Sequence, residues 1–97
     1  MAEVVWTAEA ERSLLKIHDY IAPDSPVNAF NVVQAIYARA QILSRFPQLG
    51  YAYRSPSGRE TRILLWGHYR IAYVPKGEEV HILGVFHGAM DLKEYLR

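Results

Sequence analysis

The 97-residue chain contains no cysteine, and this absence excludes several classes of protein at once. Without thiols there is no disulfide framework, no thiolate zinc site and no cysteine nucleophile, which is compatible with a reducing compartment. No stretch approaches the roughly 20 apolar residues that a membrane-spanning helix requires. The first residues also lack the basic and apolar regions of a secretion signal. We therefore expect a cytoplasmic protein, not attached to a membrane, whose mature form begins near Met1.

The chain also has little net charge, +1 at pH 7. A protein that relies on many phosphate contacts is usually far more basic, so the balance argues against a large nucleic-acid interface. The charge is unevenly distributed, because residues 51–75 contain four arginines and one glutamate. That segment is also rich in aromatic residues, and it favours a polyanion or an acidic peptide as a partner.

Composition predicts one ordinary globular domain. Hydrophobic residues make up 51% of the chain and charged residues 22%, which is typical of a folded protein. A chain of this length can build one core but not two. The sequence has no internal repeat, no low-complexity segment and no linker. We expect a single domain over residues 1–97.

The first half of the sequence predicts a short strand and then two helices. Residues 2–6 are β-prone, and Thr7 is a good N-cap for a helix with acidic residues in its first turn. That helix carries one apolar stripe at helical spacing, namely Ala10, Leu14, Ile17 and Ile21. It ends at Ala22-Pro23, and Ser25-Pro26 begins a second helix that we expect to run to Phe46-Pro47. The short connection predicts an antiparallel hairpin.

The second half predicts a loop, three strands and a helical tail. Residues 48–59 are rich in glycine, proline and serine, which indicates a loop. Three β-like runs follow, residues 60–66, 69–74 and 79–87, and the breaks between them are short enough for hairpins. Residues 90–97 can form a short helix. The predicted fold is α+β: an N-terminal strand, a helical hairpin, a three-stranded antiparallel meander packed on the helices, and a C-terminal helix.

Two arginines interrupt these apolar strands. Arg62 lies in the first run and Arg70 in the second, and burying an unpaired guanidinium is costly. Each must therefore reach solvent, a carboxylate or a ligand. One interpretation is a structural ion pair, such as Arg70 with Glu60 or Asp91. The other is that Arg62 and Arg70 both point into an open concave face of the sheet.

Histidine is the second candidate for chemistry. His87 ends the third run, either as a polar stop or as a group that exchanges a proton near neutral pH. No two histidines have the spacing of metal ligands, so we expect no metal. Ser55 and Ser57 lack a paired histidine and acid, which argues against a serine hydrolase. A glycine-rich phosphate loop is absent, and we expect no cofactor.

In order, these features resemble the RelE/ParE toxin superfamily of bacterial type II toxin–antitoxin systems. The matching segments are Val5-Trp6-Thr7 leading into Ala10 and Leu14, Ala29, Phe46-Pro47 with Gly50, Arg62, Tyr69-Arg70-Ile71-Ala72-Tyr73, and Val85-Phe86-His87. They span nearly the whole chain. The resemblance implies the same α+β fold and a toxin function.

The superfamily contains two activities, and the resemblance implies different roles for the same residues in each. RelE-like members cleave mRNA on the ribosome, and there Arg70 would stabilise the phosphate while His87, with Tyr95 in the tail, would serve as acid or base. ParE-like members poison DNA gyrase without an established catalytic site. The lysines of RelE-like members would fall near Thr61 and Ile63, which carry no charge. We therefore expect a ParE-like toxin, with an mRNA interferase and an inactive regulatory module as the alternatives.

Either activity implies a protein antitoxin as partner. A disordered antitoxin segment that folds on the toxin can cover a large area. We expect it to dock on apolar surface of the helical hairpin and the sheet edge. Its acidic residues would meet the arginines of the basic segment, namely Arg54, Arg59, Arg62 and Arg70.

Overall fold

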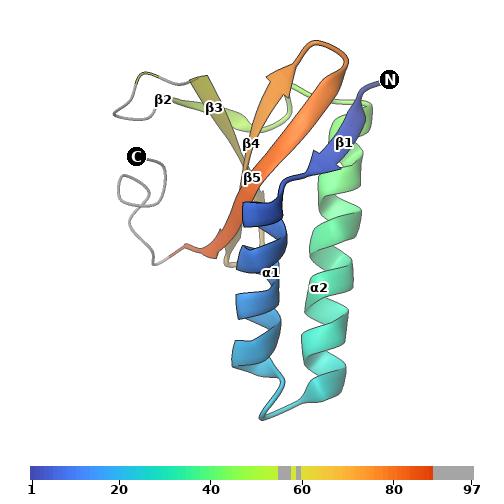
Figure 1. Cartoon of the computed structure of the whole chain (residues 1–97), viewed down its shortest axis with the longest axis vertical. Helices are drawn as coiled ribbons and strands as arrows, with labels where there is room; N and C mark the ends of the chain where they lie inside the picture. Colours follow the sequence, from blue (N-terminus) through green and yellow to red (C-terminus); the bar gives the residue numbers. More distant parts are fainter. Residues whose placement is uncertain (55–57, 59, 89–97) are drawn as a thin grey trace.

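The protein is a single layer of β-sheet with a helical hairpin packed on one face (Figure 1). The computed structural model describes residues 1–54, 58 and 60–88. Its elements in chain order are β1 (Glu3–Trp6), α1 (Ala8–Ile21), α2 (Pro26–Gln41), the 3-10 helix η1 (Ile42–Ser44), β2 (Tyr51–Arg54), β3 (Glu60–Trp66), β4 (Tyr69–Lys76) and β5 (Glu79–His87). The strands form one mixed sheet in the order β1-β5-β4-β3-β2.

Both helices begin where their capping residues predict. The Thr7 hydroxyl accepts a hydrogen bond from the Ala10 amide at 3.1 Å, and the Ser25 hydroxyl accepts one from the Asn28 amide at 3.1 Å. These bonds satisfy amides that have no partner inside a helix. Figure 1 shows α1 and α2 side by side, running beyond one end of the sheet. The predicted hairpin is confirmed.

The sheet is antiparallel except at its first strand. β3, β4 and β5 form the predicted meander, and both tight turns contain a glycine with positive φ, 56° at Gly67 and 63° at Gly77. β1 pairs in parallel with only the first half of β5, Glu3–Trp6 against Glu79–Ile82. The second half of β5 therefore has no strand beside it on that side within the described residues.

The main differences from the prediction are an additional strand and an earlier end of the second helix, while β4 extends two residues beyond its predicted end, to Lys76. Tyr51–Arg54 lies inside the predicted loop, yet it forms β2 and pairs with β3 at the sheet edge. Loop-forming residues flank this short aromatic segment on both sides, so the sequence pattern indicates a loop and not a strand. In addition, α2 ends at Gln41 and passes into η1, short of the predicted end. The predicted helix at residues 90–97 lies outside the described residues.

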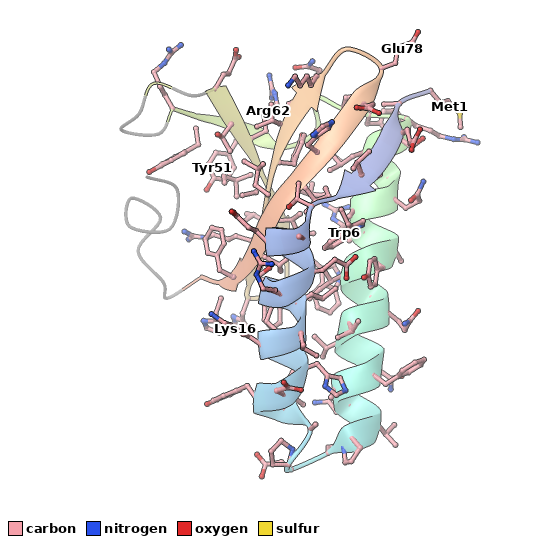
Figure 2. The ribbon with its side chains drawn as sticks, in the orientation of Figure 1. Met1, Trp6, Lys16, Tyr51, Arg62 and Glu78 are labelled. Atoms are coloured by element: carbon pink, nitrogen blue, oxygen red, sulfur yellow. The ribbon has the colours of Figure 1, made fainter. Side chains whose placement is uncertain are left out.

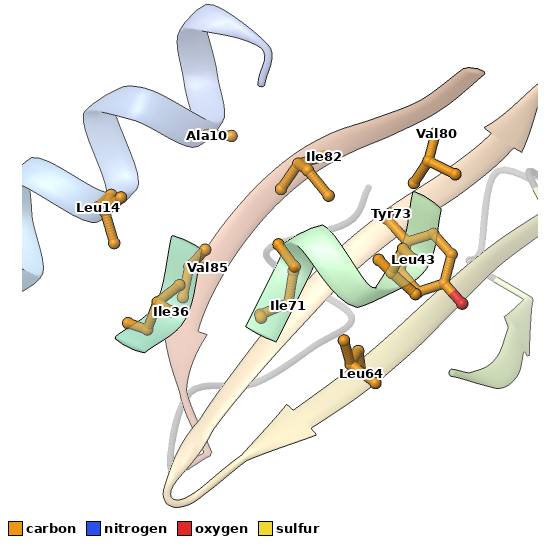
Figure 3. Close-up of a cluster of buried hydrophobic side chains, with 11 residues drawn as sticks. Ala10, Leu14, Ile36, Leu43, Leu64, Ile71, Tyr73, Val80, Ile82 and Val85 are labelled. Atoms are coloured by element: carbon orange, nitrogen blue, oxygen red, sulfur yellow. The ribbon is translucent and has the colours of Figure 1, made fainter. Parts of the chain in front are cut away.

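The main core lies between the helices and the sheet (Figure 3). Its largest members are fully buried side chains from both layers, including Ile36 and Leu43 of the helical part and Ile71, Tyr73 and Ile82 of the sheet. Burying such side chains contributes about 1.5–3 kcal/mol each. A smaller cluster of Ile63, Ala72 and Phe86 lies on the opposite face of the sheet. Both faces of β4 are therefore apolar.

Polar side chains of α1 fix the helix to β5. The Thr7 hydroxyl donates a hydrogen bond to the Ile82 carbonyl at 2.7 Å. The Ser13 hydroxyl accepts one from the Val85 amide at 2.8 Å and donates to the Ala10 carbonyl at 2.7 Å. Ser13 thus satisfies an amide on the part of β5 that β1 does not cover. This contact sets the position of α1 beside the end of β5, where the candidate site lies.

Candidate functional site

A cavity of about 340 Å³ opens at the end of the β3–β4 hairpin. Its lining comprises Leu65, Gly67, His68, Tyr69, Arg70, His87 and Gly88. The Gly88 amide donates a hydrogen bond to the His68 carbonyl at 2.7 Å, which holds the end of β5 against the hairpin turn. The structure therefore brings Arg70 and His87, two residues singled out in the sequence, to one cavity.

Aromatic rings surround His87. Its ring stacks on His68 with centroids 5.9 Å apart and planes at 22°. The Tyr69 ring meets it edge-on at 5.7 Å and itself stacks on Trp66 at 6.1 Å. Rings packed in this way limit the rotation of one another, so the position of His87 is defined by its neighbours as well as by the strand.

His68 was not expected in this site. The sequence shows it only as part of the tight turn after β3. The register of β4 and β5 places Tyr69 opposite His87, and this pairing brings the turn residue beside the strand end. His68 could be placed in the site only by knowing that the β3–β4 turn lies against the end of β5.

The guanidinium of Arg70 forms no ion pair among residues 1–54, 58 and 60–88. The expected pair with Glu60 is thus wrong, and Asp91 lies outside the described residues. Arg70 lies opposite Leu65 and Phe86 in the sheet and is half-buried. A half-buried arginine without a carboxylate can bind an anion or a carbonyl group of a partner.

Arg62 lies on the other face of the sheet. Arg62 pairs with Tyr73, and Arg70 pairs with Leu65. Paired residues on neighbouring strands lie on the same face, and successive residues of one strand alternate between faces. Tyr73 and Arg70 are three positions apart on β4, so Arg62 and Arg70 lie on opposite faces. The prediction that Arg62 and Arg70 share one open face is therefore wrong. Arg62 lies on the face that packs against the helices, near the top of the sheet in Figure 2.

Arg62 instead holds the loop that precedes β2. Its Nη1 donates hydrogen bonds to the Gly50 carbonyl at 2.6 Å and the Gln48 carbonyl at 3.1 Å. The buried Tyr73 hydroxyl accepts a bond from the Gly50 amide at 2.8 Å and donates to the Pro47 carbonyl at 2.7 Å. Burial raises the pKa of Tyr73, against the opposing effects of the Gly50 bond and the Arg62 charge. This network gives Arg62 a structural role.

The remaining predicted residues lie away from the cavity or outside the described part of the chain. Arg54 is exposed on edge strand β2 and lies opposite Glu60. Arg59 and Tyr95 are outside the described residues. The described residues contain no cluster of three or more potential metal ligands. None of the described helices is long and apolar enough to span a membrane.

The face of the sheet that carries Arg70 is largely apolar in the described residues. Thr61 and Ile63, at the positions where RelE-like lysines would fall, are each 1% exposed. Tyr53 and Leu83 pack on the apolar cluster of the same face, and Leu65 at the cavity rim is 50% exposed. Within the described residues, this face of the sheet has more apolar side chains than cations, which suits a protein partner more than a polyanion.

The helical hairpin on one face of the five-stranded sheet, with Arg70 and His87 at one cavity, is the arrangement expected of the RelE/ParE toxin superfamily. The family model described as the ParE toxin of type II toxin–antitoxin system, parDE, matches residues 4–92. Toxin RelE2 of Caulobacter vibrioides is 32% identical over 89 residues, which cover 92% of this chain and 98% of the relative. The chain belongs to the ParE toxin family.

Two solved structures have the same fold. The chromosomal ParDE toxin–antitoxin system of P. aeruginosa has a TM-score of 0.71 and 26% identity, covering 90% of this chain and 96% of that chain. The RelBE2 toxin–antitoxin complex of Mycobacterium tuberculosis has a TM-score of 0.68 and 28% identity, covering 89% and 96%. The predicted α+β toxin fold is confirmed.

Proposed function

We propose that this toxin arrests growth by inhibiting DNA gyrase and that a cognate antitoxin neutralises it. The observation that carries the proposal is the burial of Thr61 and Ile63 at the positions where an RNA-cleaving relative would present lysines. Neither side chain can attract a ribosome or stabilise a phosphate. Gyrase acts in the cytoplasm, and we propose that compartment for the toxin as well.

The antitoxin part of the proposal has separate support. The two solved neighbours are a toxin–antitoxin system and a toxin–antitoxin complex, and the matching family is the toxin of a type II toxin–antitoxin system. None of the lysines and arginines described forms an ion pair with a carboxylate, since the two ion pairs present involve histidines. Many cations on the surface are therefore available to an acidic partner.

A second candidate activity is ribosome-associated cleavage of mRNA. It is favoured by the shared cavity of Arg70 and His87. In that reaction the ribose 2′-oxygen attacks the adjacent phosphorus, and the bond from phosphorus to the 5′-oxygen breaks. Arg70 would stabilise the charge on the phosphate, and His87 would transfer protons to or from the two oxygens.

Pulse labelling after induction of the chain alone tests the proposal. Gyrase inhibition predicts that DNA synthesis stops first and that purified toxin with gyrase accumulates cleaved DNA. If translation stops first and mRNA is cut, the proposed target is wrong and the nuclease is the better description. Absence of any arrest would indicate an inactive or regulatory module.

Two variants separate the activities further. Arg70→Ala and His87→Ala should each lower RNA cleavage by about 100-fold or more if these side chains perform the chemistry. A gyrase inhibitor needs no proton transfer at His87, so His87→Ala should retain most of the arrest of DNA synthesis. Circular dichroism and thermal unfolding of each variant provide the control for folding.

A further inference from the structure

Helix α2 turns one side to the sheet and the opposite side to solvent. Its buried residues, Ala29, Ile36 and Ala40, lie at helical spacing on the side of the core. The residues on the opposite side are all exposed, namely Val27, Phe30, Asn31, Gln34, Ala38 and Gln41. We call this set the α2 outer face.

The α2 outer face carries no charge over the whole length of the helix. Arg39 is the one charged residue of α2, and its Nε donates a hydrogen bond to the Leu65 carbonyl on the sheet at 3.2 Å. Helix propensity does not explain this composition, because lysine and glutamate suit exposed helix positions better than valine, phenylalanine or asparagine. Exposed apolar side chains without charge are typical of the centre of a protein interface.

The two ends of the α2 outer face have different shapes. At its start Val27 and Phe30 are 71% and 59% exposed. At its other end lies a hollow of about 340 Å³, lined by Ala38 and Gln41 of the face and by the apolar side chains of Met1, Ile42 and Phe46. Figure 2 shows Met1 beside this end of α2. The face thus combines two projecting apolar side chains with an apolar hollow.

The two ends also carry opposite charges. Asp24 lies just before α2 and Arg45 lies just after η1, and both are exposed. The ion pairs of the described residues join His18 to Asp19 and His81 to Glu79. Neither Asp24 nor Arg45 is therefore neutralised within the described part of the chain.

We propose that the α2 outer face binds the same face of a second copy of this chain. The two helices would run antiparallel about a two-fold axis at Gln34, so that residues equally distant from Gln34 face each other. Phe30 and Ala38 are both four residues from Gln34, and Val27 and Gln41 are both seven. The projecting end of each copy therefore meets the hollow of the other.

Charge and hydrogen bonding agree with this alignment. The two Gln34 amides can each donate and accept a hydrogen bond across the axis. Asp24 is ten residues before Gln34 and Arg45 is eleven after it, so each aspartate faces the arginine of the other copy. A parallel pair would instead place Asp24 against Asp24 and Arg45 against Arg45, and it would align the helix dipoles unfavourably.

Other occupants fit the α2 outer face less well. A nucleic acid would meet no cation on the face itself, and neither would an acidic peptide. The dimer also leaves the toxin site open, because Arg70 lies on the face of the sheet opposite the helices. Two Arg70 cavities in one assembly would let the toxin bind a two-site target more tightly than a single copy does. The inference goes beyond the proposed function and does not depend on the identity of the target.

Sedimentation velocity of the full-length toxin over a range of concentrations tests the proposal. One helix per copy makes a small interface, so we expect a reversible dimer of micromolar affinity. Gln34→Glu places two carboxylates beside the axis and should weaken the dimer by at least about tenfold. Gln48→Glu is the matched control, because it adds the same charge at an exposed residue outside the α2 outer face, and it should change the affinity by less than about threefold.

Exchange of the terminal charges tests the antiparallel alignment. Asp24→Lys and Arg45→Glu should each weaken the dimer by at least about threefold, because each creates two like-charge contacts per dimer. The double variant restores opposite charges and should return to within about twofold of wild type. Losses that simply add in the double variant would overturn the proposal.

Three further results would also overturn it. The first is a toxin that remains monomeric up to about 1 mM, and the second is equal weakening by Gln34→Glu and Gln48→Glu. The third is a monomeric toxin in which Gln34→Glu lowers the affinity for the antitoxin encoded beside its gene, since the face would then belong to the antitoxin. Circular dichroism of each variant ensures that loss of the dimer is not loss of the fold.

Discussion

Replacing Thr61 with valine should stabilise the toxin. Thr61 is 1% exposed, and its hydroxyl has no hydrogen-bond partner among the described residues. Burying such a group costs about 1–3 kcal/mol on protein scales. Valine has the same branched shape, keeps the packing of β3 and suits a strand. We expect a gain of about 1 kcal/mol in the free energy of unfolding, which corresponds to a rise in Tm of about 4–8 °C for a domain of this size.

Thr7→Val is the matched control, because the same chemical change should have the opposite sign there. The Thr7 hydroxyl caps α1 and donates to the Ile82 carbonyl, so its loss removes a cap and leaves a carbonyl unpaired. We expect a loss of about 1–2 kcal/mol.

Urea unfolding followed by circular dichroism measures both variants, with an unchanged m-value as the check that only stability has moved. A Thr61→Val protein that is less stable than wild type would show that the buried hydroxyl is satisfied. A Thr7→Val protein with the same free energy of unfolding as wild type would refute the role of the Thr7 hydroxyl as the cap of α1.

Three further outcomes follow from other parts of the molecule. Gly50→Ala should cost about 1–3 kcal/mol in urea unfolding, because a Cβ there would lie 2.7 Å from the Ile63 carbonyl oxygen and 2.7 Å from the Tyr73 ring; a loss below about 0.5 kcal/mol would contradict this packing. Burial, then the Glu11 carboxylate, raises the pKa of Tyr37 from 10.0 to about 12. Its contribution to stability should be complete below pH 10 and decline as pH rises from 10 towards 12, so the Tm of Tyr37→Phe should fall less steeply over that range, and parallel curves would be the contrary result. Arg62→Met should lower stability more than Arg70→Met, as measured by thermal unfolding, and an equal effect of the two would argue against the loop-holding network.

The parts of the fold set by neighbouring residues could be predicted from the sequence. Thr7 and Ser25 cap their helices through side chains that act three residues away, and Gly67 and Gly77 adopt the positive φ that their turns require. Such features depend on local geometry, which the residue types determine. The order of helices and strands followed from them.

The parts set by distant pairing could not be predicted. Alternation places Arg62 and Leu64 on one face of β3, but it does not say that the helices cover this face. The pairing of Arg62 with Tyr73 depends on the register of the whole meander. The short strand β2 was not predicted, because it is stabilised by pairing with the edge of β3 and not by a pattern in its own sequence. For the same reason the sequence indicated Arg70 and His87 but not His68.

The parallel pairing of β1 with β5 determines when the toxin can finish folding during its synthesis. Residues 3–6 emerge from the ribosome well before their partners, residues 79–82. Pairing of segments so far apart in the chain is slow, because a long loop must close before any contact compensates for its loss of entropy. The pairing that positions α1 and the Arg70 cavity thus forms only after β5 has been translated. A chain cut short before β5 would lack this strand, so premature termination yields no assembled toxin.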